Sequence, residues 1–139
     1  MFLNQNLNLE QKEAFLKMAN EFAAVDKTLD KEEKNLLQFI VDEMIVNEES
    51  LYLRELIGEK PENKENLLNK FDTSSAKKTV ILQLIILGYV DNDFCHKEND
   101  YINEIAQKFD IEQDEIDKMK AWVPKQLKHV QEIEKLWKN

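Results

Sequence analysis

The sequence predicts an all-α protein: a compact bundle of about seven helices built from two pseudo-repeated helix–acidic loop–helix units. Three observations predict this fold class. The chain has 139 residues but only two glycines and two prolines, too few turn residues for a β-sandwich or barrel. Its abundant Leu, Ile, Glu, Lys and Gln are residues that helices accommodate well. Apolar side chains recur at helical spacing, and one loop pattern occurs twice.

The first unit spans about residues 9–46. Asn8 is expected to cap its first helix, with Gln11 completing a capping box. This helix runs to about residue 24, and an acidic loop follows. Asp30 is the predicted cap of the second helix, with Glu33 three residues further on. The apolar positions of the two helices are Leu9, Phe15, Met18, Ala19, Phe22, Val25, Leu36, Leu37, Ile40, Val41 and Met44.

Residues 47–73 are expected to bridge the two units. Ser50 is placed to cap a short helix that Gly58 closes, because glycine readily adopts the conformation that ends a helix. Pro61 then restarts the chain as a first-turn residue. No shift in composition marks a boundary, so a single domain over residues 1–139 is predicted. The apolar residues of this segment are Leu51, Leu53, Leu56, Ile57, Leu67, Leu68 and Phe71.

The second unit spans about residues 74–110. Ser74 or Ser75 is expected to cap a helix whose residues 80–87 are apolar nearly all round, which predicts a central, buried helix. Asp93 or Cys95 starts the next helix, and residues 109–111 turn the chain. The inward positions of that next helix are Tyr101, Ile102, Ile105 and Ala106.

A last helical region is expected over about residues 112–137. Pro124 lies inside it, and proline lacks the backbone N–H while its ring clashes with the carbonyl four residues earlier. A kink or break is therefore predicted at about residues 121–124. The predicted inward positions are Ile116, Met119, Trp122, Val123, Leu127, Val130, Ile133 and Trp137.

The two units are related by a constant offset of 65 residues. A pattern of an apolar residue, Asp, two positions, Leu or Phe, three positions and Glu begins at Val25 and again at Val90. The offset also places the apolar positions of the first helix pair on those of the second. Two such helical hairpins are expected to pack about a pseudo-twofold axis.

The loops carry candidate metal ligands. Carboxylate oxygens suit hard divalent cations such as Ca²⁺ or Mg²⁺. Zn²⁺ ranks below them, because Cys95 and His96 are adjacent and lack a second pair of ligands. The alternative is that the acids serve only as helix caps, each stabilising a helix by about 0.3–1 kcal/mol, and both interpretations stay open. The candidate ligands are Asp26, Asp30, Glu33, Asp91, Asp93 and Glu98.

Charge and composition narrow the function classes. Nineteen basic against 28 acidic residues give a net charge of −9, which disfavours nucleic-acid binding, since that requires a basic surface. The single cysteine excludes an intramolecular disulfide and fits a reducing compartment. The longest apolar run, residues 80–90, is far shorter than the ~20 residues of a spanning helix. With no signal-peptide pattern at the start, a cytoplasmic protein is expected.

The two loops resemble those of the TerB-like family of tellurite-resistance proteins. Residues 23–33 are similar to the family's first loop, residues 87–98 to its second, and residues 105–111 to its Ile-Ala-x-x-Leu/Phe-Gly-Ile ending. The resemblance covers about residues 9–123. It implies an all-helical fold with clustered acids, divalent-metal binding and a role in chemical-stress complexes at the inner face of the membrane. Lys27 and Asn92 stand where the family's loops have Gly after Asp.

Two hypotheses for function follow, neither of them enzymatic. No Ser/His/Asp pattern, glycine-rich phosphate loop or histidine pair at metal-binding spacing occurs in the chain. The first hypothesis is a TerB-like module that binds a divalent cation and works through protein contacts. The second is a metal-free acidic adaptor, inhibitor or immunity-type protein. Both predict protein partners.

Overall fold

The computed structural model describes residues 6–25, 31–45, 47–59, 63–90 and 95–138. At helical positions 32, 33, 36, 49, 90, 130, 131, 134, 137 and 138 it describes the backbone only. All regular structure in these residues is helical, so the predicted all-α fold class is confirmed. The elements are α2 (Leu9–Ala23), α3 (Lys31–Met44), the 3₁₀-helix η1 (Glu48–Leu56), α4 (Lys64–Leu68), α5 (Ser74–Val90), α6 (His96–Lys108) and α7 (Gln113–Lys138).

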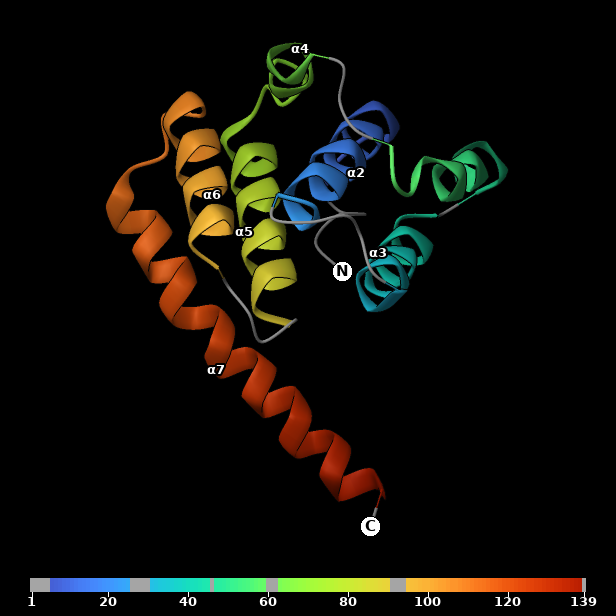
Figure 1. Ribbon diagram of the computed structural model, residues 1–139, viewed down its shortest axis with the longest axis vertical. Coiled ribbons are helices and arrows are strands. Elements are labelled where there is room, and N and C mark those ends of the chain that lie inside the picture. Colours follow the sequence, from blue (N-terminus) through green and yellow to red (C-terminus); the bar gives the residue numbers. More distant parts are fainter. Residues whose placement is uncertain (1–5, 26–30, 46, 60–62, 91–94, 139) are drawn as a thin grey trace.

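Helix α5 lies at the centre of the bundle. Figure 1 shows it between α2 and α6, with α7 running along its outer side. It is apolar on almost every side, and Ile81, Leu84 and Ile85 have no exposed surface, as the sequence predicted. No helix in the described part of the chain combines the length and apolarity needed to cross a bilayer.

The 65-residue offset is visible in the burial of side chains. Helices α2 and α3 form the first hairpin, α5 and α6 form the second, and α2 packs on α5 between them. Apolar residues 65 positions apart are buried in both hairpins, so the repeat in sequence corresponds to a repeat in core positions. These pairs are Phe15 and Val80, Leu16 and Ile81, Ala19 and Leu84, Phe22 and Leu87, Leu37 and Ile102, Ile40 and Ile105, and Met44 and Phe109.

Two predicted helix starts are confirmed by hydrogen bonds. At α2 the Oδ1 atom of Asn8 accepts from the backbone N–H of Gln11 at 2.8 Å, and the N–H of Asn8 donates to Oε1 of Gln11 at 3.0 Å. At α6 Cys95 is the cap and Glu98 completes the box. Gly58, predicted to close the short helix, has φ +94°, which a glycine adopts without strain.

Other predicted caps are wrong by one to three residues. Thr73, not Ser74 or Ser75, caps α5, because its Oγ1 accepts from the N–H of Ala76 at 3.0 Å. Asn47 caps η1, and Ser50 stands three residues inside as its capping-box partner. Ser, Thr and Asn cap almost equally well, so sequence alone could not rank neighbouring candidates. Pro61 lies outside the described residues, and Asn63 caps α4.

Of the kink or break predicted at about residues 121–124, the break is wrong. Helix α7 continues without interruption from residue 113 to residue 138 with Pro124 inside it. The proline ring is exposed, while Val123 is buried and Leu127 packs partly on the core. These contacts on both sides of the proline hold the helix together, so the missing hydrogen bond weakens the helix there without ending it.

Two residues predicted to face inward on α7 are exposed instead. Trp122 is 42% exposed and Ile133 is 47% exposed. Ile116 and Val123 are buried as predicted, whereas the side chains of Val130 and Trp137 are outside the description. For Ile133 the reason is length: a 26-residue helix is about 39 Å long and a 17-residue helix about 26 Å. Trp122 directly precedes the buried Val123 and lies beside Leu82 and Met119, where the bundle covers it only in part. The last turns of α7 therefore extend past the end of α5 (Figure 1).

Candidate functional site

The structure describes the side chain of only one predicted metal ligand. Asp26, Asp30, Asp91 and Asp93 lie outside the described residues, and Glu33 is described by its backbone in α3 alone. Glu98 is the exception: its Oε1 accepts from the N–H of Cys95 at 3.1 Å, and its own N–H donates to Sγ of Cys95 at 3.4 Å. Glu98 thus acts as a helix cap, the alternative role considered for the loop acids, and its role as a metal ligand stays a prediction. The described residues contain no cluster of three or more potential ligands.

A charged cluster surrounds the buried Tyr101, where α2, α4 and α6 meet. The Nζ atom of Lys64 lies 4.4 Å from the centre of the Tyr101 ring, 3.2 Å from Oε1 of Glu21 and 3.7 Å from Oε1 of Glu104. Burial raises the pKa of Tyr101 well above its ordinary value, and the carboxylate of Glu21 adds to the rise. Because the phenol of Tyr101 stays protonated at neutral pH, it cannot act as a general base there. The role of the cluster is therefore structural: its side chains join α2, α4 and α6.

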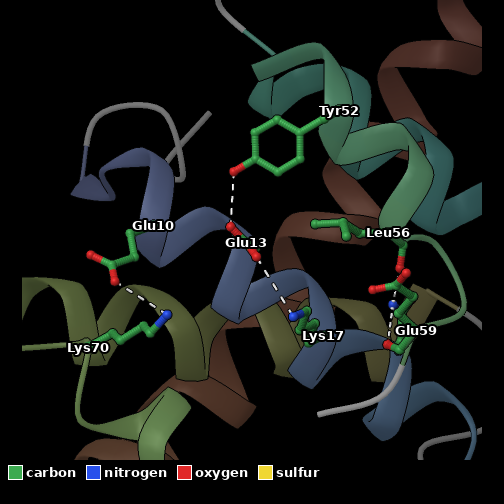
Figure 2. Close-up of polar contacts among 8 residues, drawn as sticks. Glu10, Glu13, Lys17, Tyr52, Leu56, Glu59 and Lys70 are labelled. Carbon is green, nitrogen blue, oxygen red and sulfur yellow. Dashed lines mark hydrogen bonds and ion pairs between the residues drawn. The ribbon is translucent and has the colours of Figure 1, made fainter. Parts of the chain in front are cut away.

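A second set of polar contacts runs along the exposed side of α2. Figure 2 shows the hydroxyl of Tyr52 donating to Oε2 of Glu13 at 3.0 Å. It also shows Glu13 paired with Lys17 at 3.7 Å, and Glu10 with Lys70 at 3.3 Å. Burial and the neighbouring Glu13 raise the pKa of Tyr52. These are partly exposed contacts between α2 and its neighbours, each expected to contribute little stability.

Two buried polar residues of α2 were missed by the sequence reasoning. The amide nitrogen of Asn20 donates to the carbonyl oxygens of Leu56 at 2.7 Å and Glu59 at 2.8 Å. Lys12 donates to the carbonyl oxygen of Met44 at 3.2 Å, and burial lowers its pKa. Lys12 satisfies a carbonyl at the end of α3, and Asn20 satisfies one at the end of η1 and one in the turn after it. The sequence did contain one indication of this arrangement: Lys12 and Asn20 are eight residues apart, and this spacing places both on one side of α2.

The open hollows near Phe109 have lysines at their edges. One, of about 420 Å³, lies between α4 and the ends of α5 and α6, and Lys77 and Lys108 contribute to its wall. An adjoining hollow of about 310 Å³ includes Lys77 and Lys78. Lys78 pairs with Glu115 at 3.1 Å and Lys108 with Glu104 at 3.6 Å, while Lys77 lies over the Phe109 ring. Two of the three cations are thus already neutralised by carboxylates.

Large apolar side chains are exposed on the end of α7. We call residues 125–138 the α7 arm. Leu127 near its base still packs partly on the core, and Figure 1 shows the rest of the arm extending beyond the other elements. Ile133 is 47% exposed and Leu136 is 77% exposed. Trp122 stands at the base of the arm, where it forms an apolar hollow of about 460 Å³ with Leu82 and Met119.

A second exposed apolar area lies on α3 and η1, and we call it the α3–η1 face. Its large apolar residues are Phe39, 57% exposed, and Leu51, 45% exposed. Asp42 lies three residues after Phe39, and Arg54 lies three residues after Leu51. The Nε atom of Arg54 pairs with Oδ1 of Asp42 at 3.1 Å, which links η1 to α3. Residues three apart share one side of an α- or 3₁₀-helix, so Phe39 and Leu51 flank this ion pair on one surface.

Comparison with known proteins gives no match: neither a family model, nor a curated protein, nor a solved structure matches the chain. The geometry therefore carries the functional argument. The described residues offer a charged cluster that joins helices, open hollows edged by paired lysines, and two exposed apolar surfaces. The apolar side chains of these two surfaces are the ones that the core of the described residues leaves exposed.

Proposed function

We propose that this protein is a non-enzymatic, TerB-like helical module that acts through protein–protein contacts. One observation carries the proposal: the α7 arm presents large apolar side chains on a helix that has left the core. Ile133 and Leu136 lie on the arm, 11 and 14 residues after Trp122 at its base; these spacings are close to three and four helical turns, so all three lie on one side of α7. Large apolar side chains exposed on one side of a helix favour association with another surface.

Divalent-cation binding is a separable part of this proposal. It rests on the six loop carboxylates and on the resemblance to TerB-like proteins, which also supplies the proposed context of chemical-stress complexes at the membrane's inner face. Ca²⁺ or Mg²⁺ would suit carboxylate ligands better than Zn²⁺. The cation would hold the ends of the two hairpins and would leave the α7 arm free for its partner.

A metal-free interaction protein, such as an acidic adaptor, inhibitor or immunity-type protein, is the second candidate. The observation in its favour is that Glu98 already has a structural role. Its carboxylate accepts the N–H of Cys95 at the start of α6, and this cap needs no cation. Both candidates require the α7 arm to contact another protein.

Photo-crosslinking tests that shared requirement. A photoreactive amino acid replaces Leu136 on the arm, and in a matched control it replaces Gln107, which is exposed on α6. In an extract of the source cells, position 136 should form light-dependent adducts with one or a few defined protein chains, a second copy of this chain included. Position 107 should form far fewer. Equal, diffuse labelling from both positions would contradict the proposal.

A further inference from the structure

We propose that the partner of the α7 arm is a second copy of this chain, whose α3–η1 face receives the arm. This inference rests on the proposed function, because it names the protein that the arm contacts. The arrangement is reciprocal: the arm of each copy lies on the α3–η1 face of the other, so the two contacts are related by a twofold axis.

The distribution of charge supports this pairing. Residues 118–138 contain six lysines and two glutamates, a net charge of +4. Since the whole chain carries −9, the remainder carries −13. Within that remainder, residues 38–56 contain five acids and one arginine, a net charge of −4. The arm itself, residues 125–138, holds four of these lysines and both glutamates, a net charge of +2. A basic arm and an acidic face attract one another, and the attraction steers their encounter.

The two surfaces also match in their apolar residues, since each exposes two large apolar side chains. Ile133 and Leu136 lie exposed on the arm, as Phe39 and Leu51 do on the α3–η1 face. An exposed ion pair such as that of Asp42 and Arg54 contributes little by itself, so Asp42 can turn to an incoming lysine at small cost. Apolar contact at the centre with charged residues around it is the usual composition of a protein interface.

The arm cannot reach the α3–η1 face of its own chain. It is the continuation of helix α7, whose Val123 is buried on the core. In Figure 1 the arm runs away from the body and its end is well separated from α3. The 14 residues of the arm span about 21 Å, so a second copy can receive it along several turns.

The same charges disfavour the other ways of covering the arm. Two arms packed against each other would bring together two basic segments. An anionic bilayer would attract a basic amphipathic helix, but it would repel the −13 body and would leave Phe39 and Leu51 uncovered. Pairing with a second copy covers both apolar surfaces at once. Because each dimer contains two such contacts, it buries twice the area of a single contact, which brings the total closer to the ~1,600 Å² of a standard interface.

A charge exchange between two variants of the full chain tests this inference. The arm variant carries Lys125→Glu, Lys128→Glu and Lys135→Glu; the face variant carries Asp42→Lys, Glu48→Lys and Glu55→Lys. All six positions are exposed, so both variants should retain the helical circular dichroism and cooperative melting of the wild type. Sedimentation velocity at low ionic strength gives the mass of each protein alone and of their equimolar mixture.

The wild type should form a dimer that dissociates as salt is raised. Each variant alone should be a monomer, because its arm and face carry like charge, and the mixture should form a heterodimer. A wild type that stays monomeric over the whole concentration range would overturn the inference, as would two variants that dimerise alone or a mixture that stays monomeric. Leu136→Asp, at a side chain already 77% exposed, should also weaken the dimer at least tenfold without unfolding the chain.

Two further outcomes separate this inference from the function on which it rests. If the purified chain is monomeric while position 136 crosslinks to a different protein in extracts, the second copy is excluded and the interaction module stands. If the chain is monomeric and its arm binds vesicles of anionic lipid in a lysine-dependent way, a membrane replaces the second copy and both proposals fail.

Discussion

The hydroxyl of Tyr101 on α6 donates a hydrogen bond to the carbonyl oxygen of Met18 on α2, at a distance of 3.3 Å. The ring of Tyr101 also packs on that of Phe22, with 5.7 Å between the ring centres. One side chain therefore links the second hairpin to the first. This link lies beneath Lys64, which covers the outer side of the ring.

Replacing Tyr101 by Phe should destabilise the fold modestly. The substitution keeps the ring and removes one buried hydrogen bond, whose net contribution is about 1 kcal/mol. Urea unfolding followed by circular dichroism measures the change. Tyr52→Phe is the matched control: it removes the partly exposed bond to Glu13 and should alter the free energy of unfolding by less than about 0.5 kcal/mol. Equal losses in the two variants would contradict the assigned role of Tyr101.

The same tyrosine predicts a loss of stability at high pH. The pKa of Tyr101 is raised in the folded chain above its unfolded value of about 10. Above that pH the unfolded chain releases the phenol proton and the folded chain retains it, so the free energy of unfolding falls as pH rises. Between about pH 9 and 11, wild type should lose more stability than Tyr101→Phe. Parallel curves for the two proteins would exclude this contribution.

Replacing Pro124 by Ala should stabilise the protein. The proline lies in the interior of a continuous helix, and alanine would restore the backbone N–H that can donate to the carbonyl of Lys120. Proline in a helix interior costs about 3 kcal/mol relative to alanine, an upper limit here because proline also restricts the unfolded chain. A rise in melting temperature is expected. A fall would show that the proline fits α7 better than alanine does.

Chelation and metal addition test the cation hypothesis. Ca²⁺ or Mg²⁺ at millimolar concentration should raise the melting temperature of the wild type, because a ligand bound to the folded state stabilises it. The shift should vanish in a variant with Asp91→Asn and Glu98→Gln. It should persist with Glu112→Gln, because Glu112 is an exposed acid outside the two acidic loops that contain the predicted ligands. Since Glu98 also caps α6, each variant is compared with itself in chelator. A wild type without any shift contradicts cation binding.

Sequence patterns predicted the helical architecture because its causes are local. The apolar periodicity of α2, the nearly uniform apolarity of α5 and the capping pairs of Asn8 and Cys95 are all visible in short windows. The core positions of the two hairpins followed for the same reason.

The errors lie where the outcome depends on neighbouring elements. Periodicity alone assigned Ile133 to the core, but it cannot show that α5 ends before α7 does. It also assigned Trp122 to the core, but it cannot show how far the bundle covers that side of α7. A proline rule predicted a kink or break at about residues 121–124, but it cannot weigh the contacts that keep the helix continuous on either side of Pro124. The functional proposal rests on the exposed apolar residues of α7, and two of them, Trp122 and Ile133, were predicted from the sequence to be buried.

The size of the native assembly in a cell extract tests whether the α7 arm is the contact surface of this protein. Size-exclusion chromatography compares the full-length wild type with a variant carrying Ile133→Asp and Leu136→Asp, two exposed positions that should leave the melting temperature of the purified chain unchanged. The wild type should elute in a species larger than the monomer, and the variant should elute as a monomer. If both proteins elute at the same mass, the α7 arm is not the surface through which this protein acts.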